Sequence, residues 1–448
     1  MKNLNRIIAA VDIGTTKIVT LIGQKNENNK FEILAISKAE STGVKRGVVL
    51  NIEETVNSIM KTVEEAQTKS GLKINEVFVG IAGQHIRSVR NRGYVNRGSL
   101  EDEIKREDIQ ALINDMYKIP IDAGEEIIHV IPQNYIVDSE TGVKNPVGMV
   151  GRRLEANFHI VIGNIASAKN IEKCVNRVGL KVRQLILEPL ASSQSVLTED
   201  EKEAGVALVD IGGGTTDIAV YYDGIVWHTA VIPFGGNVVT KDIKEGCGIL
   251  PKMAEALKVQ YGAALADNIQ EDCFVTIPGI SGRGPKEISY KNLAYIIQAR
   301  MEEILDAVVF QIENSGVMEK LSAGIVITGG GSLLKDLPQL VRYKTGMDVR
   351  VGYPCEHLAA NTPADINHPM YSTAIGLILK GDDFMEANKE LDFVKVEVKN
   401  EKVVVEEFVD ETKETEEKTS EKSKLKGNFF ESIKKTFNDI FDENDAKM

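Results

Sequence analysis

Apolar and polar residues along the chain alternate in two recurring patterns. Short apolar runs at residues 7–10 and 206–208 each lead into a glycine- and threonine-rich turn, and a second apolar run follows at 18–22 and 218–221. Such a strand, turn and strand predicts a β-hairpin near each end of the first half of the chain. Elsewhere apolar residues recur every three or four positions, which predicts helices at 52–70 and 290–314.

Strands and helices are expected to alternate over most of the chain, which predicts α/β halves built around central sheets. Around residues 84–160 short predicted strands (86–89, 93–97, 126–138 and 155–162) surround one acidic helix at 103–117, which indicates a small inserted α+β region. Another helix is predicted through 333–343. Valine alternates with charged residues over 392–409, a pattern that is compatible with an additional hairpin.

The two predicted hairpins carry almost the same turn: residues 11–17 read VDIGTTK and residues 209–217 read VDIGGGTTD. Glycine lets the backbone approach a ligand, so that N–H groups can face phosphate oxygens. Threonine hydroxyls add donors, and an aspartate at the end of each strand suits a hydrated Mg²⁺. A duplicated domain that holds one nucleotide between its halves is therefore predicted, with the ligands Asp12, Gly14, Thr15, Thr16, Lys17, Asp210, Gly212, Gly213, Gly214, Thr215 and Thr216, of which Asp12 and Asp210 would hold Mg²⁺ through water.

A third glycine element, residues 328–334 with the sequence TGGGSLL, follows a predicted buried strand and opens a predicted helix. The N-terminus of a helix preceded by bare backbone suits a phosphate or a base. A simple tight turn is the alternative, but the two hairpins favour a nucleotide contact through Gly329, Gly330, Gly331 and Ser332.

Length and charge narrow the class of protein. The chain has 448 residues, more than the roughly 250–300 over which one core grows, so at least two domains are expected. A net charge of −13 argues against nucleic acid as a partner. The cysteines form no Cys-x-x-Cys pair, and no apolar run approaches the ~20 residues of a membrane-spanning helix. With no room for a signal peptide before the first strand, a cytosolic protein is predicted.

The three glycine elements, in this order and spacing, resemble those of the actin, heat-shock chaperone and sugar-kinase superfamily. Within it the chain is similar to the FtsA family of bacterial cell-division proteins over residues 5–380. The similarity rests on RIIAAVDIGTTK (6–17), GVKRGVV (43–49), GIAGQHI (80–86) and ILEPLA (186–191). An insertion after Gly83 stands where that family carries an extra subdomain. The resemblance implies a duplicated actin-like fold that binds ATP and Mg²⁺ in a cleft between its halves.

The family resemblance also implies a division of the folded part into subdomains. These are 1A (1–83 and 161–204), the inserted 1C (84–160), 2A (205–234 and 291–381) and 2B (235–290). Beyond them, composition alone predicts a flexible acidic linker (382–424), because residues 410–424 are almost wholly Glu, Lys, Thr and Ser and cannot bury enough apolar surface to fold. A C-terminal helix (425–443) is predicted after it.

Further site residues follow from the resemblance alone. Glu188, which precedes a proline, would orient the water that attacks the γ-phosphate, although it could instead cap a helix. Glu255 and Lys258 would reach the ribose, although a Glu and a Lys three residues apart often form a solvated pair. Arg300 and Glu303 would contact the C-terminal tail of FtsZ, although such a pair is common on helices.

The last segment of the chain is rich in phenylalanine. At ~100° per residue, six apolar side chains of residues 429–441 fall within about 120°, namely Phe429, Phe430, Ile433, Phe437, Ile440 and Phe441. An amphipathic helix on a flexible linker predicts binding to a membrane surface. A partner's hydrophobic groove and packing on the body are the alternatives. Few basic residues flank the apolar stripe, so burial of the rings would dominate over attraction to anionic lipid.

Together these features predict an ATP-binding, polymerising actin-like cell-division protein with at most slow ATP hydrolysis. It would form head-to-tail filaments, tether FtsZ filaments to the cytoplasmic side of the inner membrane at the septum as a peripheral protein, and help recruit other division proteins. A small-molecule kinase of the superfamily, a chaperone-type ATPase and a pilus-assembly scaffold are the alternatives.

Overall fold

The computed structural model describes residues 6–98, 102–279, 284–354, 357–360 and 362–400. The chain divides into two units between Glu390 and Leu391. The first unit contains two five-stranded sheets and a four-stranded sheet.

The first sheet has the order β11-β6-β1-β2-β3. Its strands are β1 (Ile7–Ile13), β2 (Lys17–Lys25), β3 (Phe31–Glu40), β6 (Glu76–Ile81) and β11 (Lys181–Leu187). β1 and β2 are antiparallel and pair from Ile7↔Gln24 to Ile13↔Ile18, so the first predicted hairpin is confirmed. Both faces of β1 are buried from Ile8 onward, which agrees with the near-continuous apolar run in its sequence.

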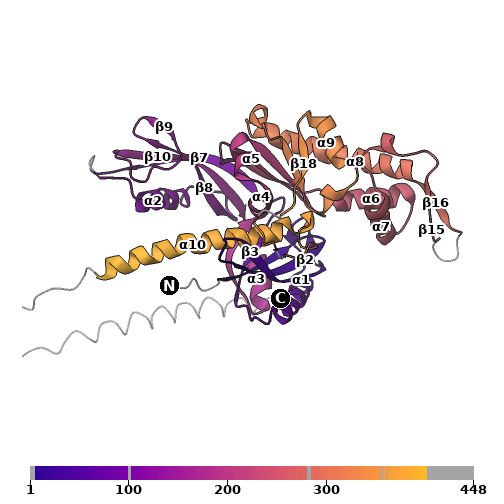
Figure 1. Cartoon of the computed structure of the whole chain (residues 1–448), viewed down its shortest axis with the longest axis horizontal. Helices are drawn as coiled ribbons and strands as arrows, with labels where there is room; N and C mark the ends of the chain where they lie inside the picture. The colour runs from indigo at the N-terminus through magenta and orange to yellow at the C-terminus, as the bar shows by residue number, and fades with distance from the viewer. Residues whose placement is uncertain (1–5, 99–101, 280–283, 355–356, 361, 401–448) are drawn as a thin grey trace, which may run out of the picture. The chain divides into compact units, whose positions relative to one another are not determined.

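Helices cover both faces of the first sheet (Figure 1). On one face lie α1 (Ile52–Ser70), which begins where predicted and is capped by the side chain of Asn51, and α3 (Ile165–Arg177). On the other face lies α10 (Ser372–Asn400). Two small strands, β4 (Val44–Lys45) and β5 (Val48–Val49), pair beside this sheet.

The second sheet repeats the strand order of the first, since β14-β13-β12-β17-β18 matches β3-β2-β1-β6-β11. Its strands are β12 (Val206–Ile211), β13 (Thr216–Tyr222), β14 (Ile225–Ile232), β17 (Ile325–Thr328) and β18 (Val349–Val351). The predicted second hairpin is confirmed by the antiparallel pairing of β12 with β13. One face packs on α6 (Gly236–Cys247), α8 (Tyr290–Asn314) and α9 (Leu337–Thr345), and the other on α4 (Glu188–Val196).

Each half contributes one helix that packs on the sheet of the other half. α4 follows a strand of the first sheet but packs under the second, whereas α10 follows the second sheet in sequence but packs under the first. The two helices cross in close contact, because a Cβ added at Gly376 would lie 1.8 Å from the carbonyl oxygen of Ala191. Close by, Ser195 Oγ donates a hydrogen bond of 2.7 Å to the carbonyl oxygen of Ser372.

The inserted α+β region forms an antiparallel sheet in the order β7-β10-β8-β9. Its elements are β7 (Arg87–Asn96), α2 (Arg106–Met116), β8 (Glu125–Val137), β9 (Glu140–Val143) and β10 (Arg153–Asn164). The separate strands predicted at 86–89 and 93–97 are wrong, because β7 is one strand. Gly93 remains inside it, and a Cβ there would lie 2.7 Å from Met116 Cε. The remaining helices and strands are α5 (Glu199–Ala204), α7 (Pro251–Tyr261), β15 (Phe274–Ile277) and β16 (Lys286–Ser289).

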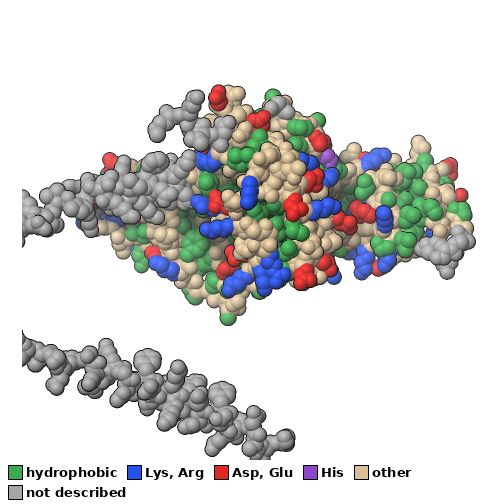
Figure 2. Space-filling view, turned by 90° about the horizontal axis from the view of Figure 1, so that it is seen from below, with side chains coloured by type: hydrophobic (Ala, Val, Ile, Leu, Met, Phe, Trp, Pro, Cys, Tyr) green, Lys and Arg blue, Asp and Glu red, His purple; other side chains and the backbone are tan. Residues whose placement is uncertain are grey.

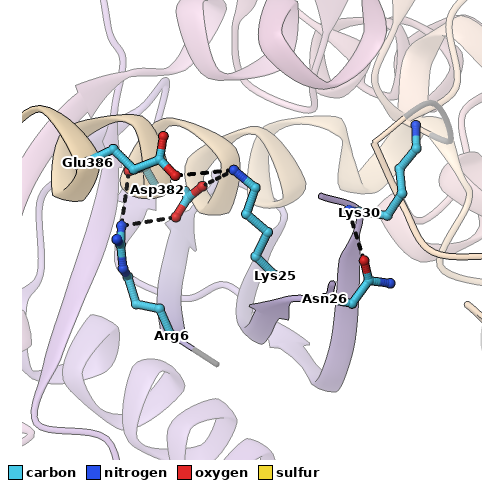
Figure 3. A network of polar contacts seen from close by, with 6 residues as sticks. All are labelled: Arg6, Lys25, Asn26, Lys30, Asp382 and Glu386. Carbon is cyan, nitrogen blue, oxygen red and sulfur yellow. Dashed lines mark hydrogen bonds and ion pairs between the residues drawn. The ribbon is translucent and has the colours of Figure 1, made fainter. Parts of the chain in front are cut away.

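The end of the predicted fold needs correction. Residues 382–400 are helical as part of α10, so neither the flexible linker predicted from 382 nor the hairpin predicted from 392 holds there. Asp382 is buried, and it forms ion pairs with Arg6 at 3.1 Å and with Lys25 at 2.9 Å (Figure 3). The remainder of the predicted linker and the predicted helix 425–443 lie outside the described residues.

The helix predicted through 333–343 begins later. A short 3₁₀ turn (Gly330–Leu333) is followed by α9, which starts at Leu337. Asp336 has a φ of 62°, a left-handed conformation that a helix cannot continue through, and a proline lies in the first turn of α9, where it is tolerated. Within the described part of the chain, no helix combines the length and apolarity that crossing a membrane requires.

Candidate functional site

The turns of the two hairpins meet, although they lie about half the chain apart. A Cβ added at Gly213 would stand 1.8 Å from Thr16 Oγ1, and one at Gly214 would stand 2.3 Å from Thr15 Oγ1. Thr15 is also held by the first half, since its Oγ1 accepts a hydrogen bond of 3.0 Å from the N–H of Gly47. This close approach requires glycine in the second turn.

Next to the turns lies a pocket of about 590 Å³, within the range typical of small-molecule sites. Three of the predicted elements contribute to its wall. The predicted ligands that line it are Thr16, Lys17, Gly212, Gly213, Glu255, Lys258, Gly330 and Gly331.

The other predicted ligands of the glycine turns support this wall from behind. A Cβ at Gly14 would lie 2.8 Å from the carbonyl oxygen of Lys17. Thr216 Oγ1 donates to the carbonyl oxygen of Phe234 at 2.8 Å, and Ser332 Oγ donates to that of Gly329 at 2.8 Å. These two hydroxyls therefore stabilise the turns themselves.

The third glycine loop is pressed against the end of β12. Gly329 has a φ of 81°, and a Cβ there would lie 2.2 Å from Asp210 Oδ1. A Cβ at Gly331 would lie 2.4 Å from Ile211 Cγ2. Only glycine allows both the left-handed backbone and this approach, which brings the loop to the second hairpin.

Four carboxyl groups gather behind the turns. Asp12, Asp210 and Asp217 are buried, and Glu188 is half-buried. Burial raises the pKa of Asp12 to about 6, with Lys17 opposing and Asp210 adding to the shift. Burial, together with nearby aspartates, raises the pKa of Glu188 and that of Asp217 well above their usual values. Ionising this cluster is costly without a cation.

The hydrogen bonds within the cluster are incomplete. Asp210 Oδ2 accepts from Ser192 Oγ at 2.5 Å and from Thr373 Oγ1 at 3.1 Å. Thr215 Oγ1 donates to Asp217 Oδ2 at 3.1 Å, but the buried Oδ1 of Asp217 has no partner among the described residues. An oxygen in this state fits a site for a hydrated divalent cation. In the described part of the chain no group of three or more His, Cys, Asp or Glu side chains is arranged to hold a metal ion directly.

Sequence reasoning omitted Asp217 from the candidate ligands. The signal was present, because Asp217 ends the second motif at the position where Lys17 ends the first. It also omitted Tyr261 and Tyr290, which line the pocket and stack with ring centroids 5.0 Å apart and planes 18° apart. Their rings offer an apolar wall on which a nucleotide base could lie.

Glu188 is the first residue of α4, followed by a proline. A Cβ added at Gly80 would lie 3.0 Å from Glu188 Oε1, which places the carboxylate at the end of β6. The preceding N–H, that of Leu187, donates a hydrogen bond of 3.0 Å to His129 Nε2 on β8. The inserted sheet thus fixes the peptide that carries this carboxylate.

Glu255 and Lys258 form more than a solvated pair. Lys258 Nζ donates to Glu255 Oε2 at 2.8 Å, to Thr240 Oγ1 at 2.8 Å and to the carbonyl oxygen of Gly236 at 3.0 Å. The lysine therefore fastens α7 to the start of α6 at the edge of the pocket.

Comparison with known proteins identifies the family. Residues 83–162 match the family model described as SHS2 domain inserted in FTSA, and residues 207–376 match that of Cell division protein FtsA. The chain is 41% identical over 377 residues to cell division protein FtsA of Pseudomonas aeruginosa, covering 84% of this chain and 89% of the relative. It is 37% identical over 385 residues to that of Escherichia coli K12, covering 84% and 91%. This chain belongs to the FtsA family of cell division proteins.

Solved structures agree with this family at the level of fold. The type IV pilus complex PilM–PilN matches with a TM-score of 0.59 at 15% identity, covering 84% of this chain and 98% of that chain. MreB5 of Spiroplasma citri bound to ADP matches with a TM-score of 0.51 at 13% identity, covering 86% and 98%. The predicted actin-like fold with an inserted α+β domain, which in FtsA is the SHS2 domain, is confirmed.

Two residues predicted from the FtsA family to contact a partner lie outside the pocket. On α8, Arg300 forms ion pairs with Asp242 of α6 and with Glu303. The Glu303 side chain is exposed. The pairs account for the position of Arg300 within the fold, and contact with FtsZ stays a prediction.

Proposed function

We propose that this FtsA-family protein binds ATP with Mg²⁺ between its two large sheets, assembles head to tail, and fastens FtsZ filaments to the cytoplasmic side of the inner membrane at the septum. The meeting of both hairpin turns and the third glycine loop at one pocket carries the nucleotide part. Lys17 and the backbone of Gly212 and Gly213 would bind phosphates. Asp12 and Asp210 would orient the water shell of Mg²⁺, which supplies positive charge against the phosphates.

ATP would contact both hairpins at once, so its binding would favour one arrangement of the two halves. Contacts between successive copies would depend on that arrangement, which links nucleotide binding to filament formation. Hydrolysis would be slow at most. Glu188, whose pKa is raised by burial and by neighbouring aspartates, would orient the attacking water, and water orientation demands close positioning.

A surface beside the pocket supports a peptide partner. Figure 2 shows apolar side chains gathered at the end of the molecule that holds α6, α7 and the β15–β16 hairpin. The exposed large apolar residues of this region are Leu250, just before α7, Val259 and Tyr261 on α7, Phe274 on β15, and Tyr295 near the start of α8. A surface of this kind suits an extended peptide such as the C-terminal tail of FtsZ, with Arg300 and Glu303 nearby.

Membrane attachment rests on the sequence of residues 425–443. Each helix would bury its phenylalanine stripe in the bilayer surface, and a filament would combine many such weak contacts through effective concentration. Filament formation and membrane binding would then strengthen each other. The SHS2 domain, residues 83–162, would present a separate surface to other division proteins.

Vesicle co-sedimentation with Mg-ATP tests the anchor. We expect the full chain to pellet with vesicles, and a chain ending at Leu425 or carrying Phe437→Asp to stay in the supernatant. Asn438→Asp is the matched control, because it adds the same charge about 100° away along the helix wheel, outside the apolar stripe. Equal vesicle binding by all four proteins would contradict the anchor. Pelleting of all four without vesicles would show polymerisation alone.

A further inference from the structure

The exposed face of α3 carries a row of positive charge. Lys169, Lys173 and Arg177 are four residues apart, so they lie on one side of the helix. All three are exposed, and with Glu172 and Asn176 they line a shallow groove. The row spans about 12 Å, at about 1.5 Å per residue.

Neighbouring elements extend this basic stripe. β11, the edge strand beside α3, begins with the exposed Lys181, and the loop before β6 adds the exposed Lys73. Arg183 of β11 lies instead over Phe384 of α10, on the other face of the sheet. The stripe and its flank hold five basic residues against three acids: Lys73, Lys169, Lys173, Arg177 and Lys181, with Glu76, Glu126 and Glu172. A local excess of this sign stands out in a chain of net charge −13.

The charges of the stripe are largely unneutralised. Of the three acids, Glu76 forms an ion pair with Arg183 at 3.5 Å. Within the described ranges no ion pair joins Lys169, Lys173 or Arg177 to an acid. Exposed cations without partners favour a partner that brings negative charge.

The stripe lies at the same sheet edge as α10. α3 and α10 cover opposite faces of the first sheet. On α10, the Phe384 ring packs edge-on against Phe78 of β6, with centroids 6.0 Å apart, and the Arg183 guanidinium lies 6.0 Å from the Phe384 centroid. Ion pairs of Asp382 with Arg6 and Lys25 fix this part of α10 (Figure 3).

The first unit ends at Glu390, about 9 Å along α10 from Phe384. The proposed membrane helix, residues 425–443, contains three lysines and four acids, so it brings little positive charge of its own. Electrostatic attraction to lipid must come from elsewhere if it contributes.

We propose that the basic stripe on α3 and β11 is a second membrane contact, which binds the headgroups of anionic lipids. This inference rests on the proposed membrane attachment and assigns part of it to the folded body. The groove residues are charged or polar, and the groove is shallow, which fits a charged, flat surface better than the apolar side chains of a peptide.

Flotation of the full chain with vesicles tests the proposal. One set of vesicles contains about 30% phosphatidylglycerol in phosphatidylcholine, and the other contains phosphatidylcholine alone. For the triple variant Lys169→Gln, Lys173→Gln and Arg177→Gln we expect roughly 100-fold weaker binding to the anionic vesicles, since each cation near such a surface contributes about fivefold. Binding to the neutral vesicles should not change, and the wild-type difference between vesicles should shrink at high salt.

The matched control is Lys241→Gln, Lys244→Gln and Lys252→Gln, three exposed lysines on α6 and α7. It removes the same total charge from elsewhere on the body, so it should bind like the wild type. Equal loss in both triple variants, or no loss in the α3 variant, would overturn the proposal. The second result would leave an acidic protein as the better match for the stripe.

These variants distinguish a failure of the anchor proposal from a failure of the stripe proposal. A chain ending at Leu425 retains the whole first unit and the stripe. If the anchor proposal alone is wrong, truncation changes nothing and the α3 variant still loses anionic binding. If the stripe proposal alone is wrong, truncation abolishes binding and the α3 variant does not differ from its control.

Discussion

The two hairpins share a fold and differ at the residue that follows their paired threonines, which is Lys17 in the first and Asp217 in the second. In the second hairpin Asp210 and Asp217 are direct cross-strand partners, whereas Asp12 in the first faces Val19. Like charges opposite one another destabilise a strand pair. The first hairpin therefore brings a lysine to the pocket beside its acid, whereas the second brings two acids that face each other.

The strand-end aspartates are also held differently. Hydroxyls from both crossing helices, Ser192 of α4 and Thr373 of α10, donate to Asp210. Asp12 accepts no side-chain hydrogen bond from a described residue, and its pKa is raised to about 6 by burial. The second hairpin is therefore fixed by the fold, whereas the first leaves its carboxylate available to a ligand's water shell.

We expect the largest effect on Mg-ATP affinity when Lys17 of the first hairpin is replaced by the acid that the second hairpin carries at this position. Lys17→Asp removes the pocket cation nearest the carboxyl cluster and adds a fifth acid to that cluster, so we expect Mg-ATP affinity to fall by about 100-fold or more, the scale of a lost charged contact. Titration calorimetry measures the affinity. Lys38→Asp, an exposed site on β3 with the same change in charge, should bind normally, and equal loss there would contradict the assignment.

Separating the two turns should have the next largest effect. Gly213→Ala places a methyl group against Thr16, and the turns must move apart, so we expect roughly tenfold weaker Mg-ATP binding in a folded protein. Combining it with Thr16→Gly removes the atom that the methyl group meets, so the double variant should lose less affinity than the sum of the two single losses. Gly284→Ala is the control, because a Cβ there meets nothing within 4 Å.

The pH dependence should distinguish the two strand-end acids. Because the pKa of Asp12 is raised to about 6, Mg-ATP affinity should decline as pH falls from about 7 to 5 and the carboxylate is protonated. Without nucleotide the sign reverses. The folded state holds this proton more tightly than the unfolded state, so the contribution of Asp12 to stability falls as pH rises from about 4 to 6. Asp12→Asn should reduce both slopes and leave the part that Glu188, Asp210 and Asp217, whose pKa values are also raised by burial, contribute. Unchanged slopes would exclude Asp12 as a source.

We expect the smallest effect from removing Asp217, whose position is taken by Lys17 in the first hairpin. Asp217→Asn relieves the repulsion with Asp210 and the cost of burying charge, so we expect the melting temperature of the nucleotide-free protein to rise by about 2 °C or more. Mg-ATP should then add less stability to the variant than to the wild type. A lower melting temperature without nucleotide would show that Asp217 stabilises the fold instead.

Sequence patterns predicted those parts of the fold that depend on neighbours along the chain. The repeated hairpins, α1 and α8 follow from apolar periodicity and caps, and their bounds agree with the prediction. The path of α10 was missed because Asp382 and its charged neighbours resemble a solvated linker. Only the distant partners Arg6 and Lys25 make burial of Asp382 possible.

In the candidate site, too, local features could be predicted from the sequence and contacts between distant residues could not. The glycine turns and strand-end aspartates could be found locally, and the structure brings them together. The stacked Tyr261 and Tyr290 could not, because one ends α7 and the other starts α8. Their contact depends on how these helices pack on the second sheet, which no spacing in the sequence encodes.

The crossing of α4 and α10 has a mechanical consequence. At Gly376 and Ala191 backbone touches backbone, with no side chain between the helices that could compress or change rotamer. A rotation of one sheet against the other about this point would need no change of side-chain rotamer there, and parts of the molecule would shift in proportion to their distance from it. Ser192 and Thr373, which hold Asp210, lie within one helical turn of the crossing. A cation bound at Asp210 would thus act close to the crossing of the two helices. A small change of angle there would move the outer parts of the molecule, where neighbouring copies would meet, by the largest distance.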